Sequence, residues 1–425
     1  MKLLFNIDVT DSKLSLLIES LTPEDLLHNK SRAPSKDTIK KRLLAYRRLM
    51  SELIHLQLHG ISFAYHQMSK SAFSYAPFGY DIFLKVVNSV QKADLINKQT
   101  GLRSNGESVA TQFSLTDEVK IKIESWKQSQ GNEWKDAFVA QDLTFPLVRA
   151  KYPRPARRGR IKPQAKEVPV TVLLKREEIL SHWRRIELLN HFYKKHPITG
   201  VPFHGLHRIF NNYSKDVSKP LEGGRLYAIG GGYQSLNSLQ RIKLKIDDEP
   251  VCEIDIKSSH LVLSSFIKRA TSATADFIDP LTLDDPYCFE EIPRSVVKAM
   301  VTLLIGSSGT SRTWTQEQRS SLLESEGINL KDYSFNKIRS TIEKSYGFIT
   351  GTTGQDISWG LLQIREADAV LSCIARLANE YDIAAYPVHD SIIVKQDDCK
   401  LASKVLLESF RSIIGYEPKL SIRLG

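Results

Sequence analysis

The chain has 425 residues, of which 41% are hydrophobic and 25% charged, so it has the composition of a globular protein with room for two or three domains. No run of about 20 apolar residues is present, which excludes an ordinary membrane span, and the four scattered cysteines fit a reducing cytoplasm. The net charge of +11 favours a polyanionic partner, most often nucleic acid. We therefore expect a cytoplasmic protein without membrane contact.

Two amphipathic helices are predicted in the first third of the chain. Apolar residues recur at helical spacing over 35–59 and over 80–93. A short strand pattern, a glycine-containing loop and a second strand pattern at 111–116 follow the second helix. This order resembles a winged helix-turn-helix and predicts a mainly helical, winged-helix-like domain over 1–145. The helix at 80–93 either contacts DNA or serves only packing and protein contact.

A basic stretch follows this region. Between residues 149 and 162 the chain has seven Lys or Arg and no acid, and Pro153, Pro155 and the adjoining Pro163 keep this part extended. The stretch is either a solvated linker or a strap that neutralises nucleic-acid phosphates. Its candidate nucleic-acid-binding residues are Arg157, Arg158 and Arg160.

The remaining elements mix strands and helices. We predict a strand at 168–174, a helix at 176–195, strands at 242–246 and 251–256, a mainly helical span at 260–377, a strand–turn–strand unit at 382–394 and a helix at 399–413. The pattern indicates an α+β chain.

Two acidic motifs stand at the ends of strand patterns in the C-terminal half. Asp255 ends the strand predicted at 251–256, and Asp390 lies at the turn of the unit at 382–394. Two such strands side by side would bring both carboxylates together as a site for hard divalent cations. Two-metal phosphoryl transfer uses this arrangement.

A cationic helix is predicted between the two acidic motifs. Pro293 suits its first turn, and Arg294 and Lys298 are four residues apart, so they lie on one face. Thr302 extends the same row, and both cations could reach one triphosphate. A solvated pair on an amphipathic helix is the alternative, which the position between two acidic motifs disfavours.

The motifs, taken in order, resemble those of polymerases built on the family A plan. This group includes bacterial repair-type DNA polymerases and the single-subunit RNA polymerases of bacteriophages and mitochondria. The matching residues, which span 223–424, are Gly224-Arg225, Asp255 (motif A), Arg294-x-x-x-Lys298 (motif B), Gln363-x-x-x-Ala367-Asp368, and Val388-His389-Asp390-Ser391 (motif C).

The resemblance implies a fold, a domain division and a set of site residues. It implies a right-hand palm and fingers with an antiparallel palm sheet over 223–425, preceded by a basic linker and thumb-like helical region over 146–222. The implied Mg²⁺ ligands, with Mn²⁺ as an alternative ion, are Asp255, Asp390 and the Ile256 carbonyl. The implied nucleotide-binding residues are Arg294, Lys298, Thr302 and His260, and those for nucleic acid are Arg225, Gln363 and His389.

The chain departs from the family at positions that face the sugar. His260 stands where the DNA polymerases have a Glu that excludes ribose, and Gly306 stands where a Tyr is usual. Sugar selection therefore stays open. Glu253 lies on the same strand face as Asp255, as an extra metal ligand, a supporting group or a solvent-facing side chain.

We predict a template-dependent polymerase using two Mg²⁺ ions, by resemblance a DNA-directed DNA polymerase or primase-polymerase of a phage or mobile element. The first alternative is a compact DNA-directed RNA polymerase or primer synthase. The second is a DNA-binding replication initiator or regulator with an inactive polymerase-like domain. The expected partners are a DNA template or primer-template, nucleoside triphosphates and accessory replication proteins.

Overall fold

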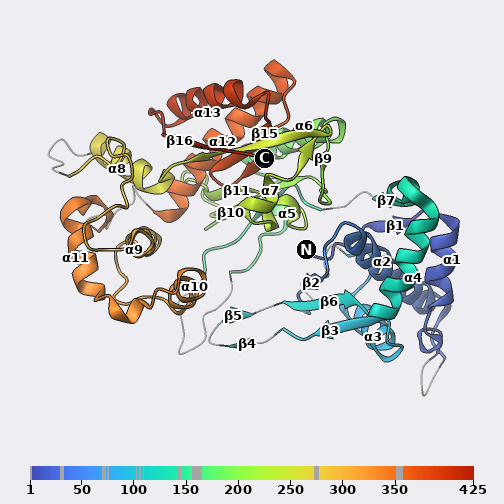
Figure 1. Ribbon diagram of the computed structural model, residues 1–425. Helices are drawn as coiled ribbons and strands as arrows, with labels where there is room; N and C mark the ends of the chain where they lie inside the picture. The colour runs from blue at the N-terminus through green and yellow to red at the C-terminus, as the bar shows by residue number, and fades with distance from the viewer. Residues whose placement is uncertain are drawn as a thin grey trace.

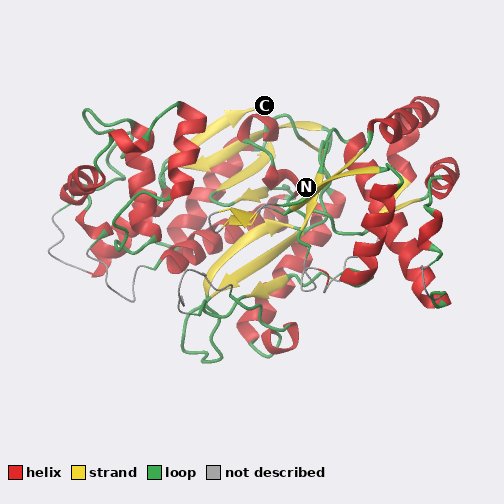
Figure 2. Ribbon diagram, turned by 90° about the horizontal axis from the view of Figure 1, so that it is seen from below, coloured by secondary structure: helices red, strands yellow, loops and turns green. Residues whose placement is uncertain are grey.

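The computed structural model describes residues 2–28, 33–68, 73, 76–101, 103–104, 107–108, 110–140, 145–155, 165–271, 277–350 and 358–425. Helices are combined with mainly antiparallel sheets, which confirms the α+β class. The N-terminal region lies to one side of the remaining chain in Figure 1, and Figure 2 shows strands in the middle with helices at both ends. Within the described ranges, no helix combines the length and apolar character needed to cross a membrane.

The N-terminal region is built on the two predicted helices. They are confirmed as α2 (Lys36–Leu58) and α3 (Tyr80–Lys92), and the apolar stripe of α3 is buried. The strands β2 (Ala64–His66), β6 (Thr111–Leu115) and β3 (Ile96–Gln99) form a three-stranded antiparallel sheet in that order. The region also contains α1 (Ser12–Ser20), α4 (Asp117–Gln130), the pair β1 (Ile7–Val9) and β7 (Phe138–Ala140), and the hairpin of β4 (Arg103–Ser104) and β5 (Glu107–Ser108). Its contact with DNA stays a prediction.

Helix α2 anchors the start of the chain through a buried carboxylate. Glu52 is 3% exposed and accepts hydrogen bonds from the backbone N–H groups of Leu4 (2.7 Å) and Phe5 (2.5 Å). Burial raises the pKa of Glu52 to about 7, although these two amides and Arg48 favour the charged form. The charged side chain therefore costs desolvation energy at neutral pH.

This carboxylate predicts a pH dependence of stability. Because the pKa of Glu52 is about 7 in the folded chain and about 4.5 when unfolded, the folded chain binds more protons between these values. The free energy of unfolding should therefore fall by roughly 3 kcal/mol as pH rises through this window. Urea denaturation of wild type and Glu52→Gln between pH 5 and 8 should show this part of the slope only in the wild type. The exposed Glu118→Gln should keep the wild-type slope, and an unchanged slope in Glu52→Gln would contradict the prediction.

A second sheet joins the middle of the chain to its C-terminal part. β10 (Leu206–Asn211) pairs antiparallel with β11 (Glu222–Ala228) and parallel with β8 (Val148–Ala150). The predicted helix that precedes β10 is confirmed as α6 (Glu177–Lys195). The pairing of β10 with β11 crosses the domain boundary expected between residues 222 and 223, and the three-part division stays a prediction.

Two expected strands differ in the structure. The strand expected at 168–174 is instead the short helix α5 (Val170–Leu173), which follows Pro169 as its N-cap; Pro169 has no N–H to donate to a strand ladder. The strand expected at 242–246 shrinks to β12 (Lys245–Ile246). There the preceding residues form α7 (Ser238–Arg241), whose N-terminus is closed by a capping box from Asn237.

Both acidic motifs belong to one six-stranded sheet. β13 (Glu249–Ile256) pairs on one side with β15 (Ser391–Lys395), to which β14 (Tyr386–Val388) is added. On its other side β13 pairs with β12 and with β16 (Leu420–Leu424), and the sheet ends at β9 (Ile198–Thr199). β16 was not predicted from the sequence, yet it places Ser421 directly beside Asp255.

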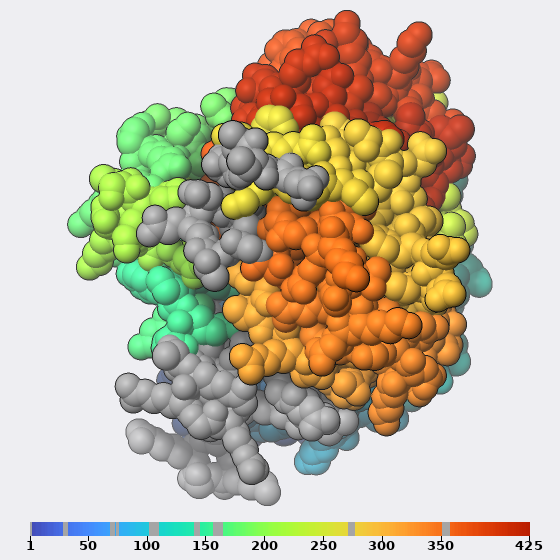
Figure 3. All heavy atoms as spheres, turned by 90° about the vertical axis from the view of Figure 1, so that its left-hand side faces the viewer, coloured from blue at the N-terminus to red at the C-terminus, as the bar shows by residue number. Residues whose placement is uncertain are grey.

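Helices flank this sheet. α12 (Trp359–Tyr381) packs against β11 and α13 (Cys399–Ile413), and α13 packs on β13 and β15. α8 (Ser259–Thr271) follows β13 directly, and three further helices gather beside it in Figure 1. They form the orange part of the face shown in Figure 3, below the red α13. These three helices are α9 (Arg294–Gly306), α10 (Gln316–Glu326) and α11 (Phe335–Ser345).

Candidate active site

The two motif aspartates meet at one end of the six-stranded sheet. Asp255 is the penultimate residue of β13, and its Cα partner on β15 is Ser391, the residue after Asp390. The Ile256 N–H donates to the Asp390 carbonyl oxygen at 3.3 Å. His389 turns the hairpin with a φ of 56°. The juxtaposition expected from the two separate motifs is thus present.

A cavity of about 570 Å³ opens over these aspartates. Most of the residues expected for metal, nucleotide or primer contact near the site line it, whereas Gln363 and His389 do not. The expected residues in the lining are Arg225, Asp255, Ile256, His260, Arg294, Lys298, Thr302 and Asp390. Further lining is supplied by the 257–259 turn, Asp284 to Tyr287, Glu366 and Ser421. Several separate chain segments therefore contribute to one polar chamber.

The carboxylates in the chamber repel one another. Burial, followed by the charges of Glu366 and Asp255, raises the pKa of Asp390 to about 7. Burial and Glu253 raise the pKa of Asp255, while Lys298 opposes the shift. Like charges held together at a protein surface are stabilised by a bound cation. The site therefore has the electrostatic character of a cation-binding site.

The donor set fits Mg²⁺. Among the described residues, no group of three or more His, Cys, Asp or Glu side chains is arranged to hold a metal. Mg²⁺ does not need such a cage, because it keeps several waters and is commonly held by one or two carboxylates together with substrate phosphates. Asp255 and Asp390, with Ile256 lining the same cavity, match that pattern.

Helix α9 presents its cations to the cavity. Val297, Met300 and Leu304 are buried on one face, whereas Arg294, Lys298 and Thr302 are exposed on the other. The helix begins one residue later than expected, with Pro293 as N-cap. Gly306 ends α9, and a Cβ there would meet no atom within 4 Å among the described residues.

Sequence reasoning missed Glu366, which is fully buried on α12 and lines the cavity. It accepts hydrogen bonds from Arg225 (Nη2 to Oε1, 2.6 Å) and Ser259 (Oγ to Oε2, 2.5 Å), and the His260 Nε2 lies 3.2 Å from Oε2. Burial opposes its ionisation, but His260, Arg225 and Ser259 hold the pKa of Glu366 at about 2. Its position in the apolar stripe of α12 was the available signal, because a lone acid there needs a buried partner.

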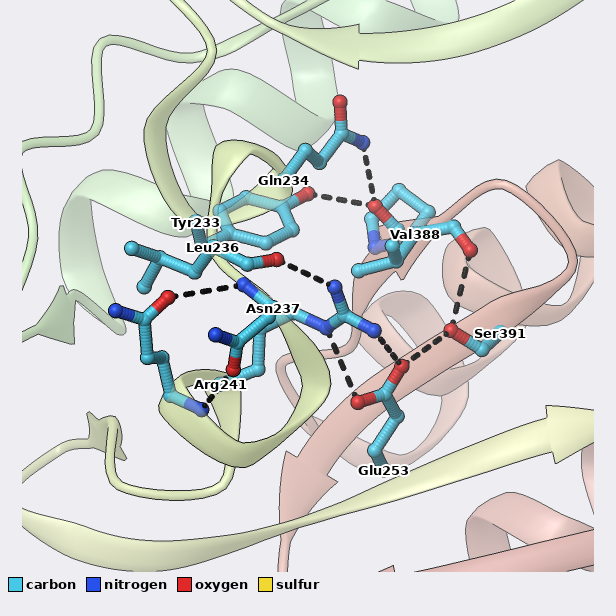
Figure 4. Close-up of polar contacts among 10 residues, drawn as sticks. Tyr233, Gln234, Leu236, Asn237, Arg241, Glu253, Val388 and Ser391 are labelled. Atoms are coloured by element: carbon cyan, nitrogen blue, oxygen red, sulfur yellow. Dashed lines mark hydrogen bonds and ion pairs between the residues drawn. The ribbon is translucent and has the colours of Figure 1, made fainter. Parts of the chain in front are cut away.

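A second polar network fixes the hairpin that carries Asp390, as Figure 4 shows. Glu253 is buried and accepts two hydrogen bonds from Arg241, at 3.0 Å and 2.7 Å. The Ser391 hydroxyl lies 3.0 Å from Glu253 and 3.1 Å from the Val388 carbonyl oxygen. Gln234 donates to the Pro387 carbonyl oxygen at 2.6 Å. The solvent-facing alternative for Glu253 is therefore wrong, and its carboxylate is occupied by Arg241.

A buried arginine explains the glycine that precedes Arg225. Arg208 is fully buried and donates from Nε to the Gly224 carbonyl oxygen and from Nη2 to Asp368, both at 2.6 Å. Gly224 has a φ of 68°, and a Cβ there would lie 2.9 Å from Phe210. Only glycine fits this close approach. Asp368, part of the motif matched on α12, thus binds Arg208.

The other expected nucleic-acid contacts lie outside the cavity lining. Gln363 and His389 are half-buried, and the His389 ring packs edge-on against Tyr227 with centroids 5.8 Å apart. Burial lowers the pKa of His389, with Arg225 acting in the same direction. Their contact with a primer-template stays a prediction. Arg157, Arg158 and Arg160 lie outside the described residues.

Comparison with solved structures gives remote similarities, of which one is described. The POL domain of Pol1 from M. smegmatis, in complex with DNA primer-template and dNTP, matches with a TM-score of 0.32 and 12% sequence identity. The match covers 58% of this chain and 52% of that chain, so this chain spans about half the length of the matched structure. A TM-score this low does not establish a shared fold. No family model matches the chain, and no curated protein matches it.

Proposed function

We propose that the chain is a template-dependent nucleic-acid polymerase, a nucleotidyltransferase that uses Mg²⁺. The observation that carries this proposal is one cavity lined both by the Asp255–Asp390 pair and by the Arg294–Lys298 row of α9. Carboxylates for metals on one wall and cations for a polyphosphate on another are what nucleotidyl transfer requires. A nuclease would need the metals, but not a dedicated cationic helix opposite them.

In the proposed mechanism Asp255 and Asp390, with the Ile256 carbonyl, hold Mg²⁺. The metal supplies activation of the primer 3′-hydroxyl and charge neutralisation at the leaving pyrophosphate. Arg294 and Lys298 bind the triphosphate, and because they rise from one helix face they hold it in a single orientation over the carboxylates. The fixed positions of the reacting groups supply much of the rate acceleration.

The other lining residues complete the substrate site. Arg225, anchored on Glu366, braces the primer-template next to the aspartates. His260 and Thr302 lie near the sugar of the incoming nucleotide. By resemblance we propose a DNA-directed DNA polymerase or primase-polymerase of a phage or mobile element. The region 1–145 would hold the duplex, 146–222 would serve as basic linker and thumb, and 223–425 would be palm and fingers.

One assay tests this proposal. Purified protein is incubated with primed and unprimed DNA and RNA templates, with dNTPs or rNTPs, and with Mg²⁺ or Mn²⁺. Template-dependent extension supports the polymerase assignment, and the substrate combination identifies template and sugar. Products made only from rNTPs would establish the RNA polymerase alternative. Absence of synthesis in every combination, together with DNA binding, would favour an initiator or regulator with an inactive polymerase-like domain.

A further inference from the structure

Arg294 is held on two sides in the wall of the cavity. Its Nε pairs with Oδ2 of Asp285, and its guanidinium carbon lies 5.4 Å from the centroid of the Tyr287 ring. The other Asp285 oxygen, Oδ1, accepts the backbone N–H of Tyr287 at 2.9 Å. One aspartate therefore fixes both the arginine and the turn that carries the ring beneath it.

This arrangement leaves the end of the arginine free for a ligand. Among the described residues, neither terminal nitrogen of Arg294 has a hydrogen-bond partner, and the side chain is 53% exposed at the cavity. A free arginine side chain on a helix surface samples many rotamers, and binding an anion then costs conformational entropy. A guanidinium whose plane is fixed by an Nε contact and an aromatic face avoids much of that cost.

The Tyr287 ring, against which the Arg294 guanidinium packs, is itself connected to the part of the cavity that carries Asp255. Tyr287 is 7% exposed, and its hydroxyl interacts with the Ser258 side chain, three residues after Asp255. From the other direction, the Lys419 ammonium donates to the Leu283 carbonyl oxygen at 2.9 Å. The segment 283–287 is thus tied to the turn after β13 and to the segment before β16.

We propose that Asp285 is a positioning residue, which with the Tyr287 ring holds the Arg294 guanidinium in the orientation that binds the triphosphate. The inference rests on the proposed function, because it assigns a partner to its nucleotide-binding arginine. The rival reading is that Asp285 is a competitor, whose negative charge occupies Arg294 until the triphosphate displaces it. The two readings predict opposite effects of removing the charge, since only a positioning residue strengthens triphosphate binding.

The test is a binding titration that needs no turnover. A fluorescently labelled dATP and a labelled ATP, each with Mg²⁺, are titrated into Asp285→Asn, Tyr287→Leu and Arg294→Ala. Asparagine keeps Oδ1 for the Tyr287 N–H, so the first variant isolates the arginine contact. We expect Asp285→Asn and Tyr287→Leu each to raise Kd by on the order of fivefold to tenfold. Adding Asp285→Asn to Arg294→Ala should cause no further loss.

Two control variants separate positioning from charge. Asp279→Asn breaks a similar arrangement outside the cavity, where Asp279 pairs with Arg269 at 3.0 Å and Arg269 lies 5.1 Å from the Phe277 ring centroid. It should leave Kd unchanged. Asp284→Asn removes a charge from the same cavity lining, at an aspartate that is 3.9 Å from Lys419 and fully exposed. It should tighten binding by about twofold through charge alone.

The outcomes are distinguishable. Weaker binding in Asp285→Asn, with an unchanged melting temperature and with tighter binding in Asp284→Asn, supports the positioning role. Binding in Asp285→Asn as tight as or tighter than in wild type, while Arg294→Ala binds weakly, overturns it and makes Asp285 a competitor. Unchanged binding in Arg294→Ala would instead contradict the assignment of Arg294 to the nucleotide site of the proposed function, and with it the positioning role of Asp285.

Discussion

Replacing either Asp255 or Asp390 by asparagine should reduce Mg²⁺-dependent primer extension by on the order of 1000-fold or more. Each change removes one carboxylate from the proposed metal site of Asp255 and Asp390, and the loss of several kcal/mol of transition-state stabilisation should follow. The fold should survive. The Asp390→Asn change would even relieve a charge that burial, Glu366 and Asp255 disfavour, as the raised pKa of Asp390, about 7, indicates.

The measurement is single-turnover extension with saturating nucleotide, together with a thermal melt of each variant. Asp248→Asn is the matched control, because Asp248 is exposed in the turn before the same strand, at a φ of 64° that asparagine tolerates well. It should extend primers like the wild type. Extension near the wild-type rate by a folded Asp255→Asn or Asp390→Asn variant would remove the metal assignment.

The parts of the site that could be predicted are those with local signals. Asp255 and Asp390 each end or join short apolar runs, and antiparallel pairing of two such strands places their ends together. The row of Arg294 and Lys298 follows from the helical period alone, and its buried opposite face confirms the orientation of α9. These features depend on residues within a few positions of one another, so the sequence displays them directly.

The parts that escaped prediction depend on distant partners. Glu366 is 141 residues from Arg225 and 107 from Ser259, and no local pattern pairs these residues. β16 is recognisable as a strand only through its pairing with β13, because Ile422 and Leu424 are exposed and form no buried stripe. At 168–174 the β-branched residues indicated a strand, but the backbone restriction at Pro169 decided in favour of a helix.

The two polar networks around the aspartates have different roles. Arg241 neutralises Glu253 beneath the hairpin and fixes the backbone of β15 through Ser391. Glu366 instead lies at the cavity itself, where it fixes Arg225 and His260 and adds negative charge next to Asp390. A change in Glu366 should therefore affect stability and the substrate site together, whereas the Glu253 network acts through the hairpin geometry.

Replacing Glu366 by glutamine should destabilise the chain by about 3–5 kcal/mol, because it leaves the Arg225 guanidinium without its buried partner. The pKa of Glu366, lowered from 4.5 to about 2, gives a similar value of roughly 3 kcal/mol. Since the folded pKa lies below the unfolded one, this stabilisation is complete above pH 4.5 and is lost as pH falls toward 2. Chemical denaturation of wild type and Glu366→Gln at several pH values measures the difference.

The same variant should also weaken binding of a primed DNA duplex, because Arg225 and His260 lose the carboxylate that orients them toward the cavity. Glu380→Gln is the control on the same helix, since Glu380 forms an exposed i,i+4 pair with Arg376 at 3.2 Å. The Glu380→Gln change should lower the free energy of unfolding by less than about 1 kcal/mol and leave duplex binding unchanged. If the stability difference between wild type and Glu366→Gln does not diminish below pH 4.5, the prediction is contradicted. The shape of the Glu366 side chain, and not its negative charge, would then be what Arg225 requires.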